Sequence, residues 1–151
     1  MPLLIVVVFV ALMSVVSVLW LPQKEAAAVA LIADVKAVNM FAYKAAVVSF
    51  LNGNPSFSGQ VPDSSITLPT GMVRDSRWVS VVNNNVLYVF EQTASNAAGL
   101  LDVIYAKTNR SILVGTSNGS YLINAKGYST GVAIPTLSPA VPTGAIVVVG
   151  R

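Results

Sequence analysis

The hydrophobic pattern begins with an apolar run from Leu3 to Leu21, in which Ser14 and Ser17 carry the polar side chains. Nineteen residues of α-helix span about 28 Å, close to the hydrocarbon thickness of a bilayer. Fourteen of these residues are Leu, Ile, Val or Phe, and none is charged. Insertion is therefore favourable by roughly 4 to 8 kcal/mol. The pattern predicts a membrane-spanning helix over residues 1–22.

Four residues of this segment are predicted to hold the anchor in the membrane. Leu3, Phe9 and Leu12 belong to the apolar run, and Trp20 suits the headgroup layer at its far end. A cleaved export signal is the main alternative, because "AAA" at 26–28 resembles a cleavage site. Such a signal needs a basic start and a shorter apolar stretch, and a core helix or strand rarely lacks a polar face for so long. We expect a retained anchor.

After Pro22 the alanine-rich text predicts an amphipathic helix over residues 23–52. Its narrow polar stripe consists of Glu25, Lys36, Asn39 and Tyr43, whose spacing places them on one side of a helix. We expect this stripe to face a partner protein.

Most of the remaining surface of this helix is apolar and needs cover. A second membrane span is unfavourable, because Asp34, Lys36 and Lys44 would each cost about 2.5 to 3.5 kcal/mol near the bilayer centre. Two alternatives stay open. The attached domain covers the helix by itself, or other membrane-rooted subunits pack against the part nearest the membrane.

A change of composition marks the start of a globular domain, residues 53–151. "NGNP" at 52–55 is a helix stop in which Asn-Gly suits a left-handed cap, and all ten glycines lie after position 52. Residues 57–72 read as loop. The runs Trp78–Val82 and Val86–Phe90, around three asparagines, predict a hairpin.

The rest of the domain predicts one further helix and three strands. The helix covers 93–109, with Thr93 or Ser95 as its N-cap. A second hairpin turns at "SNGS", residues 117–120, and 130–144 read as a proline-spaced loop. The last strand, Ala145–Val149, is apolar on both faces and is expected in the centre of the sheet. The predicted fold class is α+β: a transmembrane helix running into a long amphipathic helix, then a small antiparallel sheet with one helix.

The amino-acid composition excludes several kinds of binding and catalytic site. The net charge is +3 with no run of basic residues, which argues against a nucleic-acid surface. Histidine and cysteine are absent, so His-dependent or Cys-dependent nucleophilic systems, disulfides and the usual zinc sites cannot form. Asp63, Asp75, Glu91 and Asp102 make no recognisable acid/base or metal pair. We expect no enzyme activity, cofactor, metal or small-molecule substrate.

One basic motif is a candidate binding site. "RDSR" at 74–77 suits an anion or the carboxylate of a partner, although a solvated strand entry is the favoured interpretation. "GTSNGS" lacks the lysine and the strand–helix context of a phosphate loop and is expected to be a turn.

The layout resembles type IV pilins and pseudopilins, in which a membrane helix continues into an amphipathic helix that carries a small α+β head. It departs from them in lacking a basic leader ending in Gly and a Glu near the start of the apolar run. The chain is more similar to the PilM family of plasmid-type thin (type IVb) pilus systems. That similarity rests on the anchor, "NGNP", "LPTGMV", "RWVSVVNNNVLYVF", "LVGTSNGSYLI" and "IPTLSPAVPTGAIVVVGR".

The resemblance implies a non-enzymatic component of pilus assembly and links the chain to conjugation. It implies a single-pass protein of the bacterial inner membrane with its C-terminal domain in the periplasm, where other pilus subunits are its partners. Charge hardly decides orientation, because Lys24 is matched by Glu25. Two alternatives stay open: a minor pilin or pseudopilin-like subunit of the filament, and a secreted or anchored periplasmic binding module. Whether the chain forms a homo- or hetero-oligomer stays open as well.

Overall fold

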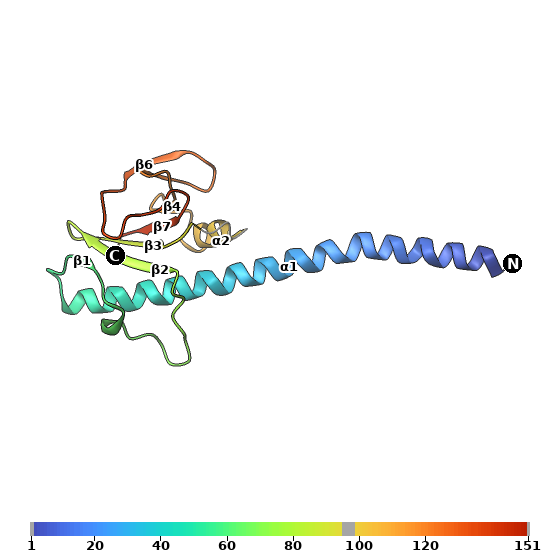
Figure 1. Cartoon of the computed structure of the whole chain (residues 1–151), viewed down its shortest axis with the longest axis horizontal. Coiled ribbons are helices and arrows are strands. Elements are labelled where there is room, and N and C mark those ends of the chain that lie inside the picture. Colours follow the sequence, from blue (N-terminus) through green and yellow to red (C-terminus); the bar gives the residue numbers. More distant parts are fainter. Residues whose placement is uncertain (1, 95–98, 151) are drawn as a thin grey trace. The chain divides into compact units, whose positions relative to one another are not determined.

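The computed structural model describes residues 2–94 and 99–150, but not the side chains of residues 2–5, 12 and 15–23. The chain divides into two compact units, Met1–Ile32 and Ala33–Arg151. Helix α1 (Pro2–Gly53, 52 residues) contributes to both units (Figure 1). The unit that holds the sheet therefore begins at Ala33, inside the segment predicted as a separate stalk.

In the first unit the described apolar side chains of α1 are exposed. Val6 to Val10 and Met13 are 50–60% accessible. The hydroxyl of Ser14 donates to the Val10 carbonyl at 2.9 Å, so this polar group is satisfied within the helix itself.

The second unit is built on a seven-stranded sheet in the order β1-β2-β3-β7-β4-β5-β6, in which every neighbouring pair is antiparallel. The long apolar helix, the antiparallel sheet and a further helix confirm the α+β class. The strands are β1 (Gly59–Gln60), β2 (Trp78–Asn83), β3 (Val86–Glu91), β4 (Val114–Ser117), β5 (Tyr121–Ile123), β6 (Ser129–Ala133) and β7 (Ile146–Val149), with a short 3-10 helix η1 (Asp63–Ser65) and helix α2 (Leu100–Lys107).

Both predicted hairpins are present. The turn between β2 and β3 places Asn84 at φ 48° and Asn85 at φ 64°, the left-handed conformation that asparagine tolerates. Gly119, at φ 98°, turns the chain between β4 and β5. Strand β7 lies between β3 and β4 with all four residues buried, which confirms its predicted central place.

Helix α2 starts later than the sequence predicted. It begins at Leu100, after Gly99 has taken a left-handed φ of 76°, so Thr93 is outside the helix and is not its cap. The other predicted cap, Ser95, lies outside the described residues. The helix ends in a Schellman arrangement, in which the Arg110 and Asn109 amides donate to the Tyr105 and Ala106 carbonyls.

The two edge strands, β1 and β6, were predicted as loops. Strand β1 has only two residues, and β6 is interrupted by an irregularity in its pairing with β5. Within β6, Ser129 and Thr130 hydroxyls accept hydrogen bonds from the amides of Gly131 and Val132. This local bonding occupies two backbone amides of the edge strand, which blunts an open sheet edge.

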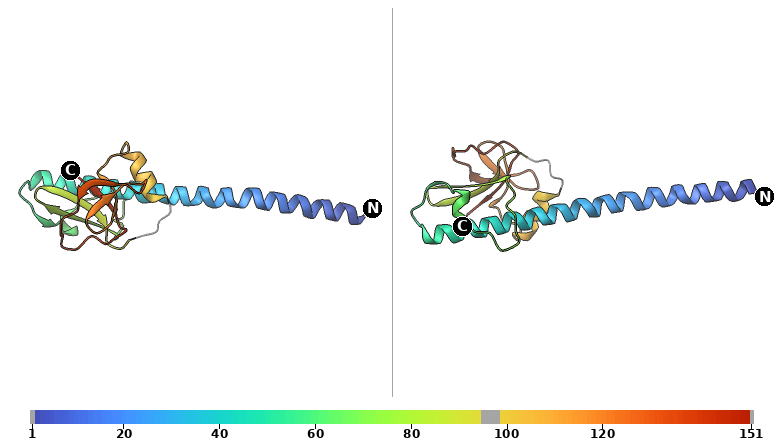
Figure 2. Two further views of the ribbon diagram at one scale, coloured as in Figure 1. Left: turned by 90° about the horizontal axis from the view of Figure 1, so that it is seen from above. Right: turned by 60° about the horizontal axis from the view of Figure 1, so that its bottom comes forward.

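The sheet has a packed core on each face. Residues 33–53 of α1 run along one face, beside β2 and β3, in both figures (Figure 1 and Figure 2). Their buried side chains meet Trp78, Val82, Leu87, Val89, Val114, Ile146 and Val148. The opposite face buries Val79, Val81, Tyr88, Phe90, Val147 and Val149 under Leu122, Ile134 and Leu137.

Candidate functional site

The connection from β1 to β2, residues 61–77, crosses α1 and is called the strap here (Figure 1). The side-chain amide of Asn39 on α1 holds it at two points. Asn39 Nδ2 donates to the Val73 carbonyl at 2.7 Å, and the Asp75 amide donates to Asn39 Oδ1 at 3.2 Å. One side chain therefore satisfies a donor and an acceptor of the strap backbone, which fixes the strap against the helix.

Tyr43, one turn further along α1, ties the helix to β2 and to the strap. Its hydroxyl lies 2.9 Å from the Ser80 hydroxyl, and both residues are buried. The Arg74 guanidinium sits 5.3 Å from the centre of the Tyr43 ring, which places a cation over an aromatic face. Arg74 also pairs with Asp63 and donates to the Trp78 carbonyl at 2.7 Å.

The second arginine of the "RDSR" motif also binds a carboxylate of its own chain. Arg77 Nε lies 3.0 and 3.1 Å from the two oxygens of Asp75. These hydrogen bonds lower the pKa of Asp75 and raise the pKa of Arg77. The motif does stand at the entry to β2, as the favoured interpretation had it, but both arginines are only partly exposed and are paired with carboxylates of the same chain.

Helix α2 is joined to α1 by an ion pair between Lys107 Nζ and Asp34 Oδ1, 2.9 Å apart. The Asp34 side chain is half exposed, so the pair adds little stability and mainly fixes orientation.

Glu91 is the deepest carboxylate, fully buried at the end of β3, where its Oε2 accepts the Ile146 amide at 3.3 Å. Among the described residues, no three of the His, Cys, Asp or Glu type gather into a metal site. The polar contacts of the domain join its own elements to one another. This arrangement docks the helix onto the sheet.

The predicted site residues differ in their exposure and in whether the structure describes their side chains. Phe9 is 58% exposed, and Glu25 is exposed in the first unit. The side chains of Leu3, Leu12 and Trp20 lie outside the described residues.

The C-terminal half of the predicted polar stripe faces the chain's own domain. Lys36 is half-buried, while Asn39 and Tyr43 contact the strap and β2. Asn39 and Tyr43 are thus occupied internally, which fits the alternative that the domain covers this side of the helix. Their contacts with residues about 35 positions away carry no sequence signal.

The side of α1 that faces away from the sheet is exposed. Val35 is 61% exposed and Val38 is 43% exposed. Ala42 is half-buried, and Ala45 and Ser49 are exposed. We call these five residues the outer seam.

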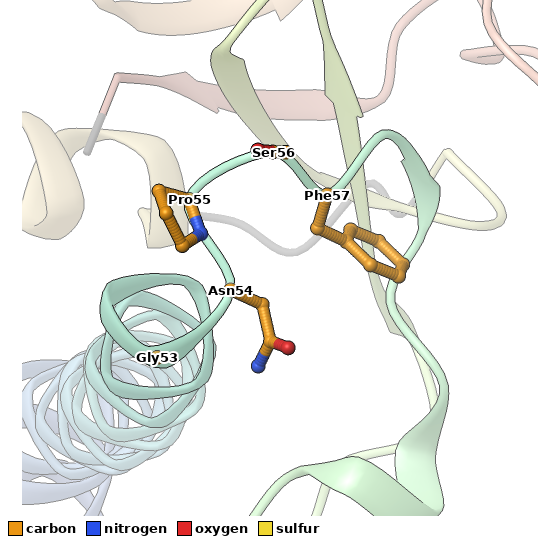
Figure 3. Close-up of a pocket in the computed structure, with 5 residues that line it drawn as sticks. All are labelled: Gly53, Asn54, Pro55, Ser56 and Phe57. Atoms are coloured by element: carbon orange, nitrogen blue, oxygen red, sulfur yellow. The ribbon is translucent and has the colours of Figure 1, made fainter.

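A shallow hollow lies at the end of α1, lined by the turn Gly53–Phe57 (Figure 3). The Asn54 side chain caps the helix by donating to the Phe50 carbonyl at 2.9 Å. The predicted stop is therefore made by a side chain, since neither Gly53 nor Asn54 has a left-handed φ. The hollow has no charged lining residue, and its features are explained by helix capping.

By length and composition, α1 can span a membrane. Within the searched residues the qualifying stretch is Lys24–Gly53. In that stretch Ala37, Met40, Tyr43, Val47 and Leu51 are at most 1% exposed inside the domain core, which is typical of a core helix.

The layout of a long apolar helix and an antiparallel sheet can be compared with known proteins. A family model described as PilM matches residues 7–149. The chain belongs to the PilM family. PilM membership assigns it to pilus biogenesis.

A solved structure shows the same fold. A crystal structure of a PilM protein from Escherichia coli B7A has a TM-score of 0.55 and 16% identity, with 78% of this chain and 90% of that chain covered. A PilM crystal structure from Pseudomonas aeruginosa 2192 has a TM-score of 0.45 and 25% identity, with 78% and 94% covered. No curated protein gives a significant match.

Proposed function

We propose that this PilM-family chain is a non-enzymatic, single-pass component of the bacterial inner membrane in the type IV (thin) pilus assembly machinery. Residues 3–21 anchor it, and the unit that begins at Ala33 works in the periplasm, where it contacts other pilus subunits. The proposal extends the family's role in pilus biogenesis to a place and a mode of action.

The observation that carries the proposal is the row of exposed apolar side chains from Val6 to Val10. A helix with no polar face is unstable in water, whereas lipid satisfies such a surface. The hydrogen bond to the Val10 carbonyl also satisfies the Ser14 hydroxyl without water.

The domain supports a role in contacts with protein. Its polar contacts connect α1, the strap and β2, and the described residues offer no gathered metal ligands. On its outside the domain instead presents the open stripe of α1, on the side of the helix away from the sheet.

The proposal is tested by deleting the chain from a piliated bacterium and complementing with the full chain carrying a reporter after Arg151. We expect piliation to be lost and then restored, with alkaline phosphatase active and a cytoplasm-dependent fluorescent protein dark. Recovery of the chain in sheared filaments would instead support a minor pilin. Undiminished piliation without the chain, or a reporter signal in the cytoplasm, contradicts the proposal.

A further inference from the structure

The line of α1 residues that packs on the sheet, opposite the outer seam, includes one charged side chain. Five positions follow this line at alternating steps of three and four residues, the spacing that keeps side chains on one side of a helix. Four of them are apolar and 0% exposed, and the fifth is a lysine: Ala37, Met40, Lys44, Val47 and Leu51. Lysine rarely occupies such a position unless its charge is paired.

Contacts of neighbouring α1 residues show the direction in which Lys44 leaves the helix. The Tyr43 hydroxyl meets Ser80 on β2, and Asp34 pairs with Lys107 on α2. At about 100° per residue, Tyr43 and Asp34 lie on opposite sides of α1. Lys44 lies between these two directions, on the side toward the sheet.

The ammonium group of Lys44 has no partner within the described part of the chain. The ion pairs among the described residues use other cations, and none of their hydrogen bonds comes from Lys44 Nζ. The side chain is half-buried, and burial lowers the pKa of Lys44 below its usual value. Phe41 and Val48, one turn away on either side, are partly buried and pack against the core. Lys44 thus holds an unpaired, partly desolvated charge on an apolar background.

A second copy of the chain is a poor source of the missing carboxylate. Four of the six acidic residues are already occupied. Asp34, Asp63 and Asp75 are in ion pairs, and Glu91 is buried. The net charge of +3 also makes two copies repel each other. Charge complementarity therefore favours a different, acidic protein.

Anionic lipid does not match the position of Lys44. The proposed anchor ends at Leu21, and Lys44 lies about 16 Å along α1 from Ala33, the first residue of the second unit. The headgroup layer of a bilayer is only about 5 to 8 Å thick on each side. A lipid phosphate would have to reach past this length of the domain.

We propose that Lys44 is the contact residue for a carboxylate of a different pilus subunit, which docks against α1 at Phe41, Lys44 and Val48. The carboxylate neutralises the ammonium group, and the two apolar side chains exclude water from the pair, which strengthens it. This inference rests on the proposed contact with other pilus subunits. It adds the residue that makes the contact and the chemistry of the partner.

Lys44→Met separates a role in binding from a role in folding, because methionine keeps a long stem without the charge. We expect the melting temperature of the full chain in detergent to rise by at least about 2 °C, since a desolvated charge is removed. Piliation of the deletion strain complemented with this variant should fall by at least about tenfold. Lys44→Arg keeps the charge and should preserve piliation. Lys126→Met removes an exposed lysine between β5 and β6 and, as the matched control, should change neither quantity.

A zero-length crosslink identifies the carboxylate. Membranes from piliated cells are treated with a water-soluble carbodiimide, which joins Lys44 Nζ to a contacting carboxylate as an amide with loss of water. Mass spectrometry then identifies the crosslinked peptides. We expect Lys44 to be bonded to an Asp or Glu of a different pilus protein. The Lys44→Arg chain should give no such peptide, because its guanidinium does not form the amide.

The outcomes separate this inference from the proposed function. Normal piliation with Lys44→Met, a lower melting temperature of that variant, no crosslink at Lys44, or a crosslink to a second copy of the chain each overturns the inference and leaves the proposed function standing. Undiminished piliation after deletion of the chain overturns both.

Discussion

At the scale of single residues, polar side chains of α1 position the helix through hydrogen bonds to the strap and to β2. Asn39 bonds a carbonyl and an amide of the strap, and Tyr43 shares a hydrogen bond with Ser80. Helical spacing correctly predicted that Asn39 and Tyr43 lie on the same side of α1. It could not show that the strap and β2 meet them, because such contacts depend on the path of a loop.

Asn39→Ala should destabilise the second unit by about 1 to 2 kcal/mol, because two groups of the strap lose their partner. The exposed Asn52→Ala on the same helix is the matched control and should change stability by less than about 0.5 kcal/mol. Thermal unfolding of the full chain in detergent, followed by near-ultraviolet circular dichroism, measures both. Equal melting temperatures for the two variants would show that the Asn39 contacts do not hold the strap.

The Asp75–Arg77 pair predicts a pH dependence. Because the folded pKa of Asp75 is lowered, its contribution to stability is present above the unfolded value of about 3.9 and is lost as pH falls through the folded pKa. Asp75→Asn should therefore be less stable than the parent chain at pH 7, with the gap closing below about pH 4. Urea midpoints at pH 7, 5 and 3.5 measure the gap; a gap that widens toward acid would refute the assigned pair.

At the scale of elements, prediction succeeded where the residue pattern is local. Positive-φ asparagines gave the β2–β3 turn, and an apolar run gave the central strand β7. Strands β1 and β6 were not predicted, because β1 is only two residues long and β6 is an edge strand with irregular pairing. The start of α2 was misplaced because Thr93 looks like a cap, whereas the observed start follows the left-handed Gly99.

The close approach of β4 to β5 depends on Gly115. A Cβ at this position would lie 2.1 Å from the Ile123 carbonyl oxygen, so Gly115→Ala requires the strands to separate. We expect a loss of about 1 to 3 kcal/mol, with faster amide exchange in β5. Gly53→Ala, where nothing lies within 4 Å, is the control and should be neutral or slightly stabilising. Normal stability of Gly115→Ala would contradict the observed strand packing.

At the scale of the whole molecule, one helix supplies two different surfaces. In the first unit its described apolar residues are exposed, as at Val6 to Val10, and in the second unit it buries one face under the sheet. Family membership gives the role in pilus biogenesis, while the exposed apolar row gives the reason to place the chain in a membrane.

The most direct test of the membrane assignment is alkaline carbonate extraction of cells that express the full chain, with mass spectrometry to verify an intact N-terminus. We expect the intact chain in the membrane pellet. Val7→Asp with Phe9→Asp should release it, because the two charges add about 6 to 8 kcal/mol to insertion, and Val7→Leu with Phe9→Leu should not. Recovery of the unaltered chain in the soluble fraction with residues 1–22 still attached would contradict the account.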